Sequence, residues 1–172
     1  MNKKLRILFV CSGNSCRSPM AQGMLRAKLP HNLSQRVTVK SAGTLGINGQ
    51  PATALAIQVA REYGADLRNH LSQGLSEELT EWADLILVME RAHLEFIKKN
   101  YPAAAERTHL LRAYGRMSPV LNGDEDIPDP IGGSLATYRE CAHLIATELD
   151  RILPLLTELV EAHEPGASGG VR

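Results

Sequence analysis

The sequence predicts an α/β fold of three layers (αβα), with a four-stranded, doubly wound parallel sheet and one domain over residues 1–163. Short apolar runs alternate with longer amphipathic segments along the chain, as in proteins built on a parallel sheet. The run Ile7-Leu8-Phe9-Val10 is typical of a buried strand, and the nearly all-apolar run Asp84–Met89 is typical of a strand covered on both faces. The chain has 172 residues, 44% of them hydrophobic, enough for one core.

Apolar runs and turn residues place the elements in order. Four strands are predicted, at Leu5–Val10, Val37–Ser41, Asp84–Met89 and Thr108–Leu111. Four helices are predicted, at Ser18–Leu29 with Ser18 as its cap, at Thr53–Tyr63, at Arg91–Asn100, and from a Ser134 cap to Ala162. Residues 112–133 form a long irregular loop, a length that often indicates function. Residues 164–172 are poor in apolar side chains, and we expect a disordered tail there.

Composition excludes several classes of partner. The 19 basic and 19 acidic residues balance, so nothing favours nucleic acid or an anionic membrane surface. No apolar run approaches the roughly 20 residues of a membrane helix, and no signal-peptide pattern follows Met1. Three cysteines suit a reducing compartment, so we expect a cytoplasmic protein. The six histidines lack ligand spacing, and we expect no metal, no cofactor, and a monomer or weak dimer.

The segment Cys11-Ser-Gly-Asn-Ser-Cys-Arg17-Ser18 carries the chemistry. It joins a predicted strand to a helix N-terminus, where backbone N–H groups of residues 12–17 and the helix dipole form an anion site. Arg17 adds a planar fork that matches phosphate oxygens. Cys11 places a nucleophile at the floor of the site, and we expect the surrounding field to lower its pKa. A loop that both binds and attacks an oxyanion predicts phosphoryl transfer.

This loop resembles the active-site loop of the low-molecular-weight protein-tyrosine phosphatases. Three further segments resemble the family in the same order, namely Ser41-Ala-Gly-Thr44, Trp82-Ala-Asp-Leu-Ile-Leu-Val-Met89 and Asp129-Pro130. The resemblance runs from about Lys4 to about Leu156. It implies a metal-independent hydrolase that acts on phosphorylated proteins through a cysteinyl-phosphate intermediate.

Such a reaction needs a nucleophile, charge stabilisation and a proton for the leaving group. Cys11 and Arg17, with the loop N–H groups, supply the first two. We expect Asp129 to supply the proton, and the resemblance implies the same, since the family's general acid is an Asp that precedes Pro. Three other carboxylates of the loop stay open as alternatives, namely Asp124, Glu125 and Asp126.

The remaining loop residues have supporting roles. We expect phosphate to be bound by Ser12, Gly13, Asn14, Ser15, Cys16, Arg17 and Ser18. The Ser18 hydroxyl is placed to donate to the Cys11 sulfur, and the resemblance suggests that Asn14 pairs with Ser41. The resemblance also suggests a reversible disulfide of Cys11 with Cys16 that protects the nucleophile. We expect Cys141 to pack in the core, and the His70–Ser72 turn to be structural.

The substrate class stays open between two branches of the family. The tyrosine-specific members carry an apolar residue at the Ser15 position and aromatic residues after Asp-Pro. Here Ser15 is polar, and Asp129-Pro-Ile-Gly-Gly-Ser134 with Tyr138 resembles the arginine-phosphatase branch. Phosphotyrosine is the main prediction, and phosphoarginine is the alternative.

Two further functions are weighed against hydrolysis. Arsenate reductases of the same fold share the loop pattern but need two more cysteines after the third strand, and residues 90–120 contain none. A module that only binds phosphoproteins would need neither Cys11 nor Asp129, so the presence of both favours an enzyme.

Overall fold

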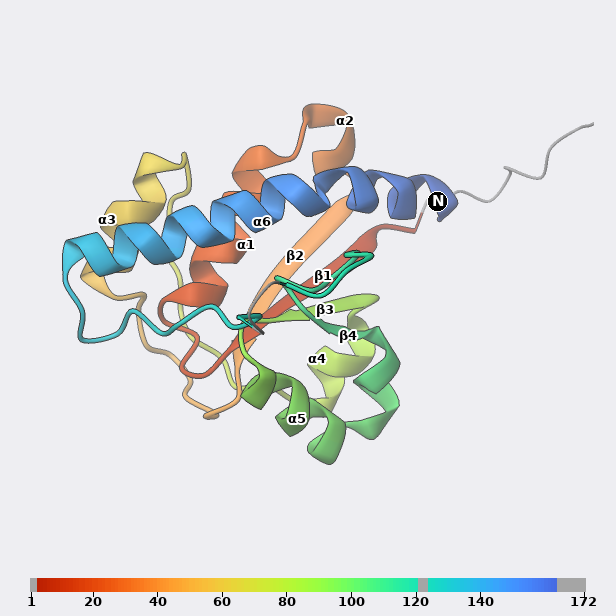
Figure 1. Cartoon of the computed structure of the whole chain (residues 1–172), viewed down its shortest axis with the longest axis horizontal. Coiled ribbons are helices and arrows are strands. Elements are labelled where there is room, and N and C mark those ends of the chain that lie inside the picture. The colour runs from red at the N-terminus through yellow and green to blue at the C-terminus, as the bar shows by residue number, and fades with distance from the viewer. Residues whose placement is uncertain (1–2, 121–123, 164–172) are drawn as a thin grey trace, which may run out of the picture.

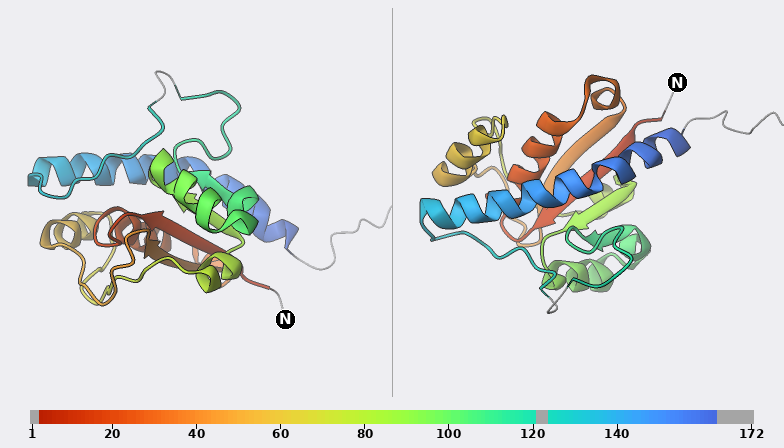
Figure 2. Two further views of the ribbon diagram at one scale, coloured as in Figure 1. Left: turned by 90° about the horizontal axis from the view of Figure 1, so that it is seen from below. Right: turned by 45° about the horizontal axis from the view of Figure 1, so that its top comes forward.

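The computed structural model describes residues 3–120 and 124–163, and a parallel sheet organises them (Figures 1 and 2). Its strands are β1 (Leu5–Cys11), β2 (Val37–Gly43), β3 (Leu85–Val88) and β4 (Thr108–Leu110). Their order is β2-β1-β3-β4, and all pairs are parallel. The chain therefore winds outward from β1 in both directions, and the carboxyl end of β1 lies at the switch point where such sheets bind ligands.

Helices cover both faces of the sheet, which confirms the three-layer prediction. One layer contains α1 (Arg17–Lys28), α3 (Ala54–Glu62) and α6 (Leu135–Ala162), which contact one another. On the other side lie α4 (Glu77–Trp82), α5 (Arg91–Asn100) and the 3-10 helix η1 (Pro102–Arg107). A short helix α2 (His31–Ser34) precedes β2.

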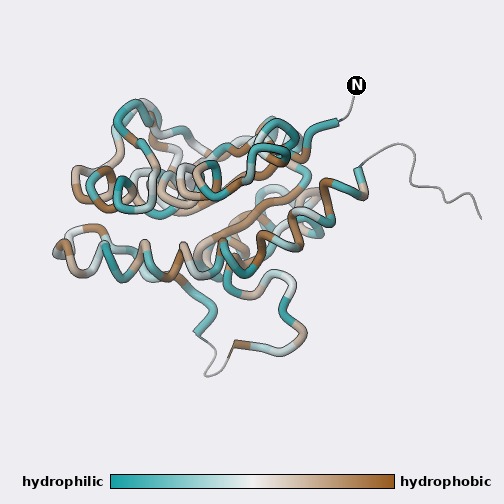
Figure 3. The backbone as a smooth tube through the Cα atoms, turned by 90° about the horizontal axis from the view of Figure 1, so that it is seen from above, coloured by the Kyte–Doolittle hydropathy of each residue, from teal (hydrophilic) through white to brown (hydrophobic). Residues whose placement is uncertain are grey.

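The two faces of β1 pack into separate cores. Ile7 and Phe9 belong to the core under α1 and α6, whereas Leu8 and Val10 belong to the core next to α5. This alternation follows from the period of two residues in a strand. Figure 3 colours the interior strands mainly as hydrophobic, whereas the colour along the helices alternates between hydrophobic and hydrophilic. The apolar run at residues 7–10 is thus a buried strand, as predicted, and it is covered on both faces.

The predicted elements agree with the structure to within two residues at their ends, but the cap of α1 was wrongly placed. The helix begins at Arg17, and its N-cap residue Cys16 makes no side-chain capping bond. Ser18 lies inside the first turn and turns its hydroxyl toward Cys11. By contrast, Ser134 caps α6 as predicted, accepting from the Thr137 N–H.

Three short helices escaped the sequence prediction. They are α2, α4 and η1, of four, six and six residues, too short for a helical period to be recognised. The predicted tail at residues 164–172 lies outside the described residues. No helix within the described part of the chain is long and apolar enough to cross a membrane.

Candidate active site

The Cys11 thiol lies at the carboxyl end of β1, and its residue is 2% exposed. Its Sγ is 2.9 Å from the Ser18 hydroxyl and accepts from the Asn14 N–H at 3.3 Å. Burial raises the pKa of the Cys11 thiol, and the Ser18 hydrogen bond and the Arg17 charge oppose this. The expected net lowering of that pKa is therefore wrong for this structure, because desolvation has the largest effect.

Asn14 holds the loop from behind. It is fully buried and adopts a left-handed conformation with φ of 55°, which asparagine tolerates better than most residues. Its Nδ2 donates to the hydroxyls of Ser18 (2.8 Å) and Ser41 (2.9 Å). Its Oδ1 accepts from the Gln73 N–H at 3.0 Å, and His70 Nε2 donates to its carbonyl oxygen at 2.7 Å. The Asn14–Ser41 pair that the family resemblance suggested is therefore present.

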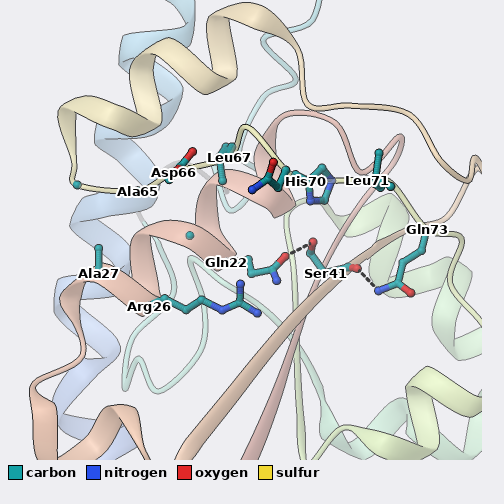
Figure 4. A pocket seen from close by; sticks show the side chains of 13 residues that line it. Gln22, Arg26, Ala27, Ser41, Ala65, Asp66, Leu67, His70, Leu71 and Gln73 are labelled. Carbon is teal, nitrogen blue, oxygen red and sulfur yellow. Dashed lines mark hydrogen bonds between the residues drawn. The ribbon is translucent and has the colours of Figure 1, made fainter.

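A cavity of about 560 Å³ lies behind this hydrogen-bond network of Asn14 (Figure 4). Ser41, His70 and Gln73 line it, and the Gln22 amide lies 2.6 Å from the Ser41 hydroxyl. Neither Cys11 nor Arg17 reaches it. This cavity therefore borders the residues that hydrogen-bond to Asn14 and does not border Cys11.

Gly43 lets the loop pass closely over β2. A Cβ atom at this position would lie 2.5 Å from the Ser12 carbonyl oxygen and 3.0 Å from the Asn14 nitrogen. Both neighbours are backbone atoms that cannot rotate away, so a side chain here would displace the loop.

Arg17 is almost fully buried and held on one side by acceptors. Its Nη1 donates to Glu90 Oε1 at 2.6 Å and to the Ile127 carbonyl at 2.8 Å. Its Nη2 lies 3.4 Å from both Ser12 Oγ and Asp129 Oδ2. The buried Nε–H has no hydrogen-bond partner among the described residues. A buried, unpaired N–H next to the loop suits an oxyanion ligand.

Of the four candidate acids, Asp129 lines the same cavity as Cys11. The other three carboxylates bind arginines or backbone outside that cavity. Glu125 pairs with Arg91 at 2.6 Å, and Asp126 accepts from the Arg91 N–H at 2.7 Å. Asp124 pairs with Arg112 at 3.3 Å. Geometry therefore separates Asp129 from its neighbours, which the sequence alone left open.

The mouth above Cys11 is a cavity of about 270 Å³ with largely apolar walls. Leu45, Ile47 and Ile131 form these walls and are exposed to solvent. Ser15, which carries a hydroxyl, also lines the cavity. None of the described residues that line the cavity is aromatic. The mouth can therefore accept an apolar stem, and its polar side chains come from the loop and from Gln50 and Asp129.

Cys16 lines the mouth together with Cys11, and its thiol also contacts Thr53 and Tyr138 of α6. Its Sγ lies 3.3 Å from the Tyr138 hydroxyl and 3.4 Å from Thr53 Oγ1, and Thr53 donates to the Tyr138 oxygen at 3.1 Å. Burial raises the pKa of Tyr138 to about 12. All three cysteines are free thiols, and Cys141 is buried in the core as predicted.

Sequence reasoning missed Glu90, His93 and Gln73 around the loop. Glu90 is the second residue after β3, and the carboxyl ends of parallel strands meet at one edge, so its position was a usable signal. His93 and Gln73 gave no local signal, because their partners Ser12 and Asn14 are 81 and 59 residues away.

Thiol nucleophiles beneath an oxyanion-binding loop of an α/β sheet are found in cysteine-dependent phosphatases, and the fold and site assign the chain to this class. A family model described as low molecular weight phosphotyrosine protein phosphatase matches residues 6–163. The chain therefore belongs to the low molecular weight phosphotyrosine protein phosphatase family, and it is a phosphoric monoester hydrolase by fold and kinship.

Relatives carry two kinds of name. A protein-arginine-phosphatase of Geobacillus stearothermophilus is 38% identical over 148 residues, covering 86% of this chain and 93% of the relative. A probable low molecular weight protein-tyrosine-phosphatase, EpsP of Ralstonia nicotianae, is 37% identical, covering 89% and 97%. Among solved structures, the YwlE arginine phosphatase from G. stearothermophilus matches with a TM-score of 0.80 and 37% identity, covering 93% and 98%. A low molecular weight protein tyrosine phosphatase from T. tengcongensis matches with a TM-score of 0.78 and 35% identity, covering 88% and 99%.

Proposed function

We propose that this chain hydrolyses phosphotyrosine on proteins through a cysteinyl-phosphate intermediate. The observation that carries the proposal is that Cys11, Arg17 and Asp129 all line one mouth. These three groups supply a nucleophile, a charge clamp and a proton donor, which together meet the needs of the reaction.

The chemistry runs in two balanced steps. In the first, the deprotonated Cys11 sulfur attacks phosphorus, the bond to the tyrosine oxygen breaks, and Asp129 gives its proton to that oxygen. In the second, Asp129 takes a proton from water, the water oxygen attacks phosphorus, and the sulfur leaves. Arg17 Nε–H and the loop N–H groups bind the phosphoryl oxygens throughout.

The depth of the nucleophile supports a long substrate side chain. Cys11 is 2% exposed at the floor of a mouth with apolar walls. A tyrosyl ring can reach the floor and contact Leu45, Ile47 and Ile131, whereas a phosphoserine is too short to do so while its backbone stays outside.

Phosphoarginine is a second candidate, favoured by Ser15. The Ser15 side chain, which carries a hydroxyl, lines the mouth at the position where tyrosine-specific members have an apolar residue. None of the described residues that line the mouth is aromatic. Relatives at 38% and 35% identity are named protein-arginine-phosphatases. With this substrate the same steps break a P–N bond, and Asp129 protonates the guanidino nitrogen.

The deciding experiment compares steady-state turnover of one phosphotyrosine and one phosphoarginine peptide of the same flanking sequence. A tenfold difference in kcat/KM corresponds to about 1.4 kcal/mol of transition-state discrimination and assigns the branch. Cys11→Ser and Asp129→Ala are the catalytic controls. Turnover of neither peptide by reduced protein would overturn the proposed function.

We also propose that Cys16 protects Cys11 in a cytoplasmic, reducing setting. Peroxide would oxidise the Cys11 thiolate to a sulfenic acid, and the Cys16 thiol would then displace water to form a disulfide that thiols reduce. Cys16→Ser should lower the fraction of activity that dithiothreitol restores after peroxide treatment. Cys141→Ser is the matched control and should leave that fraction as in the wild type.

A further inference from the structure

Ser12 carries a hydroxyl at the mouth whose bonding is unusual. Its Oγ lies 2.9 Å from His93 Nε2 and 3.4 Å from Arg17 Nη2. Arginine is always a donor, so one lone pair of the hydroxyl is occupied by Arg17. Whether the second is occupied depends on which ring nitrogen of His93 carries the proton.

The N-cap residue of α5, Glu90, decides which nitrogen carries the proton. The Glu90 N–H donates to His93 Nδ1 at 3.0 Å, so Nδ1 is an acceptor and the ring proton is on Nε2. His93 Nε2–H therefore donates to Ser12 Oγ. Burial, and secondly the charge of Arg17, lower the pKa of His93 to about 4, so the ring is neutral at neutral pH and keeps this tautomer.

Both lone pairs of Ser12 Oγ thus accept from N–H donors, and its single proton must point elsewhere. No acceptor for that proton is found among the described residues. Ser12 lines the same cavity as Cys11, Arg17 and Asp129. A hydroxyl whose acceptor sites are filled becomes an obligate donor, and the open direction is the mouth.

We propose that Ser12 is a catalytic residue whose hydroxyl donates a hydrogen bond to a phosphoryl oxygen, with His93 as its positioning residue. This proposal rests on the proposed phosphatase function and adds a side-chain donor to the backbone N–H groups and Arg17. No proton is transferred by Ser12. Its hydrogen bond stabilises the negative charge on the equatorial phosphoryl oxygens in both transition states.

The test compares Ser12→Thr with Ser12→Val, two variants of nearly equal shape that differ in one hydroxyl. We expect Ser12→Thr to keep kcat within about threefold, and Ser12→Val to lose roughly 100- to 1000-fold in kcat, as for removal of one oxyanion-hole donor. In Ser12→Val, the Ki of orthovanadate, which mimics the five-coordinate transition state, should rise by a similar factor. The Ki of inorganic phosphate should rise by less. Equal kcat values for the two variants would overturn the proposal.

A double-mutant cycle tests the role of His93. If His93 acts through Ser12, His93→Phe should lower kcat in the wild type, and should lower it no further in the Ser12→Val background. Independent, multiplicative losses would overturn the positioning role. His143→Phe, on the exposed face of α6, is the matched control and should leave kcat unchanged. Failure of the phosphatase function itself would appear differently, as absence of turnover in the wild-type enzyme.

Discussion

The back and the mouth of the phosphate loop are built in opposite ways. At the back, Asn14 is fully buried and its side-chain and carbonyl oxygens and its amide nitrogen all have partners. At the mouth, Leu45 and Ile131 are more than half exposed, and the Asp129 side chain is 38% exposed. The back fixes the position of the reacting atoms, while the mouth can change with little effect on folding. Stability and turnover should therefore respond to the back, and substrate choice to the mouth.

Asp129→Ala should have the largest effect, because Asp129 is the half-exposed residue of the mouth that we propose as the general acid. Loss of a general acid typically costs 10²–10⁴ in rate, so we expect kcat on phosphotyrosine to fall by about that factor. The loss should be smaller for an aryl phosphate with an acidic phenol, because such a leaving group needs less protonation. Steady-state kinetics on both substrates measure this.

Asp124→Asn is the matched control, since this carboxylate lies outside the catalytic mouth and pairs with Arg112. It should leave kcat nearly unchanged. A comparable loss in this variant would mean that the acid was wrongly assigned.

Asn14→Ala should test the back of the loop through stability. The change removes three hydrogen bonds of a buried side chain and leaves an alanine in a left-handed conformation, at a cost of about 2–4 kcal/mol in unfolding free energy. Asn14→Gly removes the same bonds without the backbone strain, and should be about 1 kcal/mol more stable than the alanine variant. Urea unfolding measures both. Wild-type stability in Asn14→Ala would contradict the bracing role.

Ser18→Ala should have an intermediate effect, acting on the nucleophile itself. The Ser18 hydrogen bond lowers the pKa of the Cys11 thiol against the effect of burial, so its removal should raise that pKa. Alkylation of Cys11 by iodoacetate is followed as a function of pH, with mass spectrometry to identify the modified residue. The pH midpoint of this reaction measures the pKa of the Cys11 thiol. A midpoint that stays in place or moves to lower pH would show that Ser18 does not stabilise the thiolate. We expect kcat at neutral pH to fall about tenfold.

Ile131→Ala should have the smallest effect, and we expect it to change substrate binding at the mouth without changing stability or kcat. Ile131 is 60% exposed, so unfolding free energy should change by no more than about 0.5 kcal/mol. Lost contact with the substrate stem should raise KM about two- to fivefold, with kcat unchanged. A large loss of stability or of kcat would contradict the division between back and mouth.

The sequence predicted best what is local along the chain. The strand at residues 5–10, the loop from Cys11 to Ser18 and the cap at Ser134 depend on neighbouring residues, and the structure agrees with them. The cap assignment of Ser18 was wrong because a hydroxyl near a helix start can bond in two directions, and here the Cys11 sulfur and the Asn14 amide take it.

The sequence predicted least well what depends on distant contacts and on burial. Glu90 and His93 meet the loop only because β3 lies beside β1. The Cys11 pKa depends on how completely the thiol is desolvated, a property of the packed core. The proposal of Asp129 over its three neighbours needed the two ion pairs and the backbone hydrogen bond that hold the others.

The strand order β2-β1-β3-β4 also has a kinetic consequence. The site draws on segments around residues 11–18, 41–43, 70–73, 90–93 and 127–131, so no fragment of the chain contains it. Parallel pairing of strands far apart in sequence is slow compared with helix formation. During refolding, helical circular dichroism should return before turnover does, and catalytic activity serves as a reporter of complete native topology.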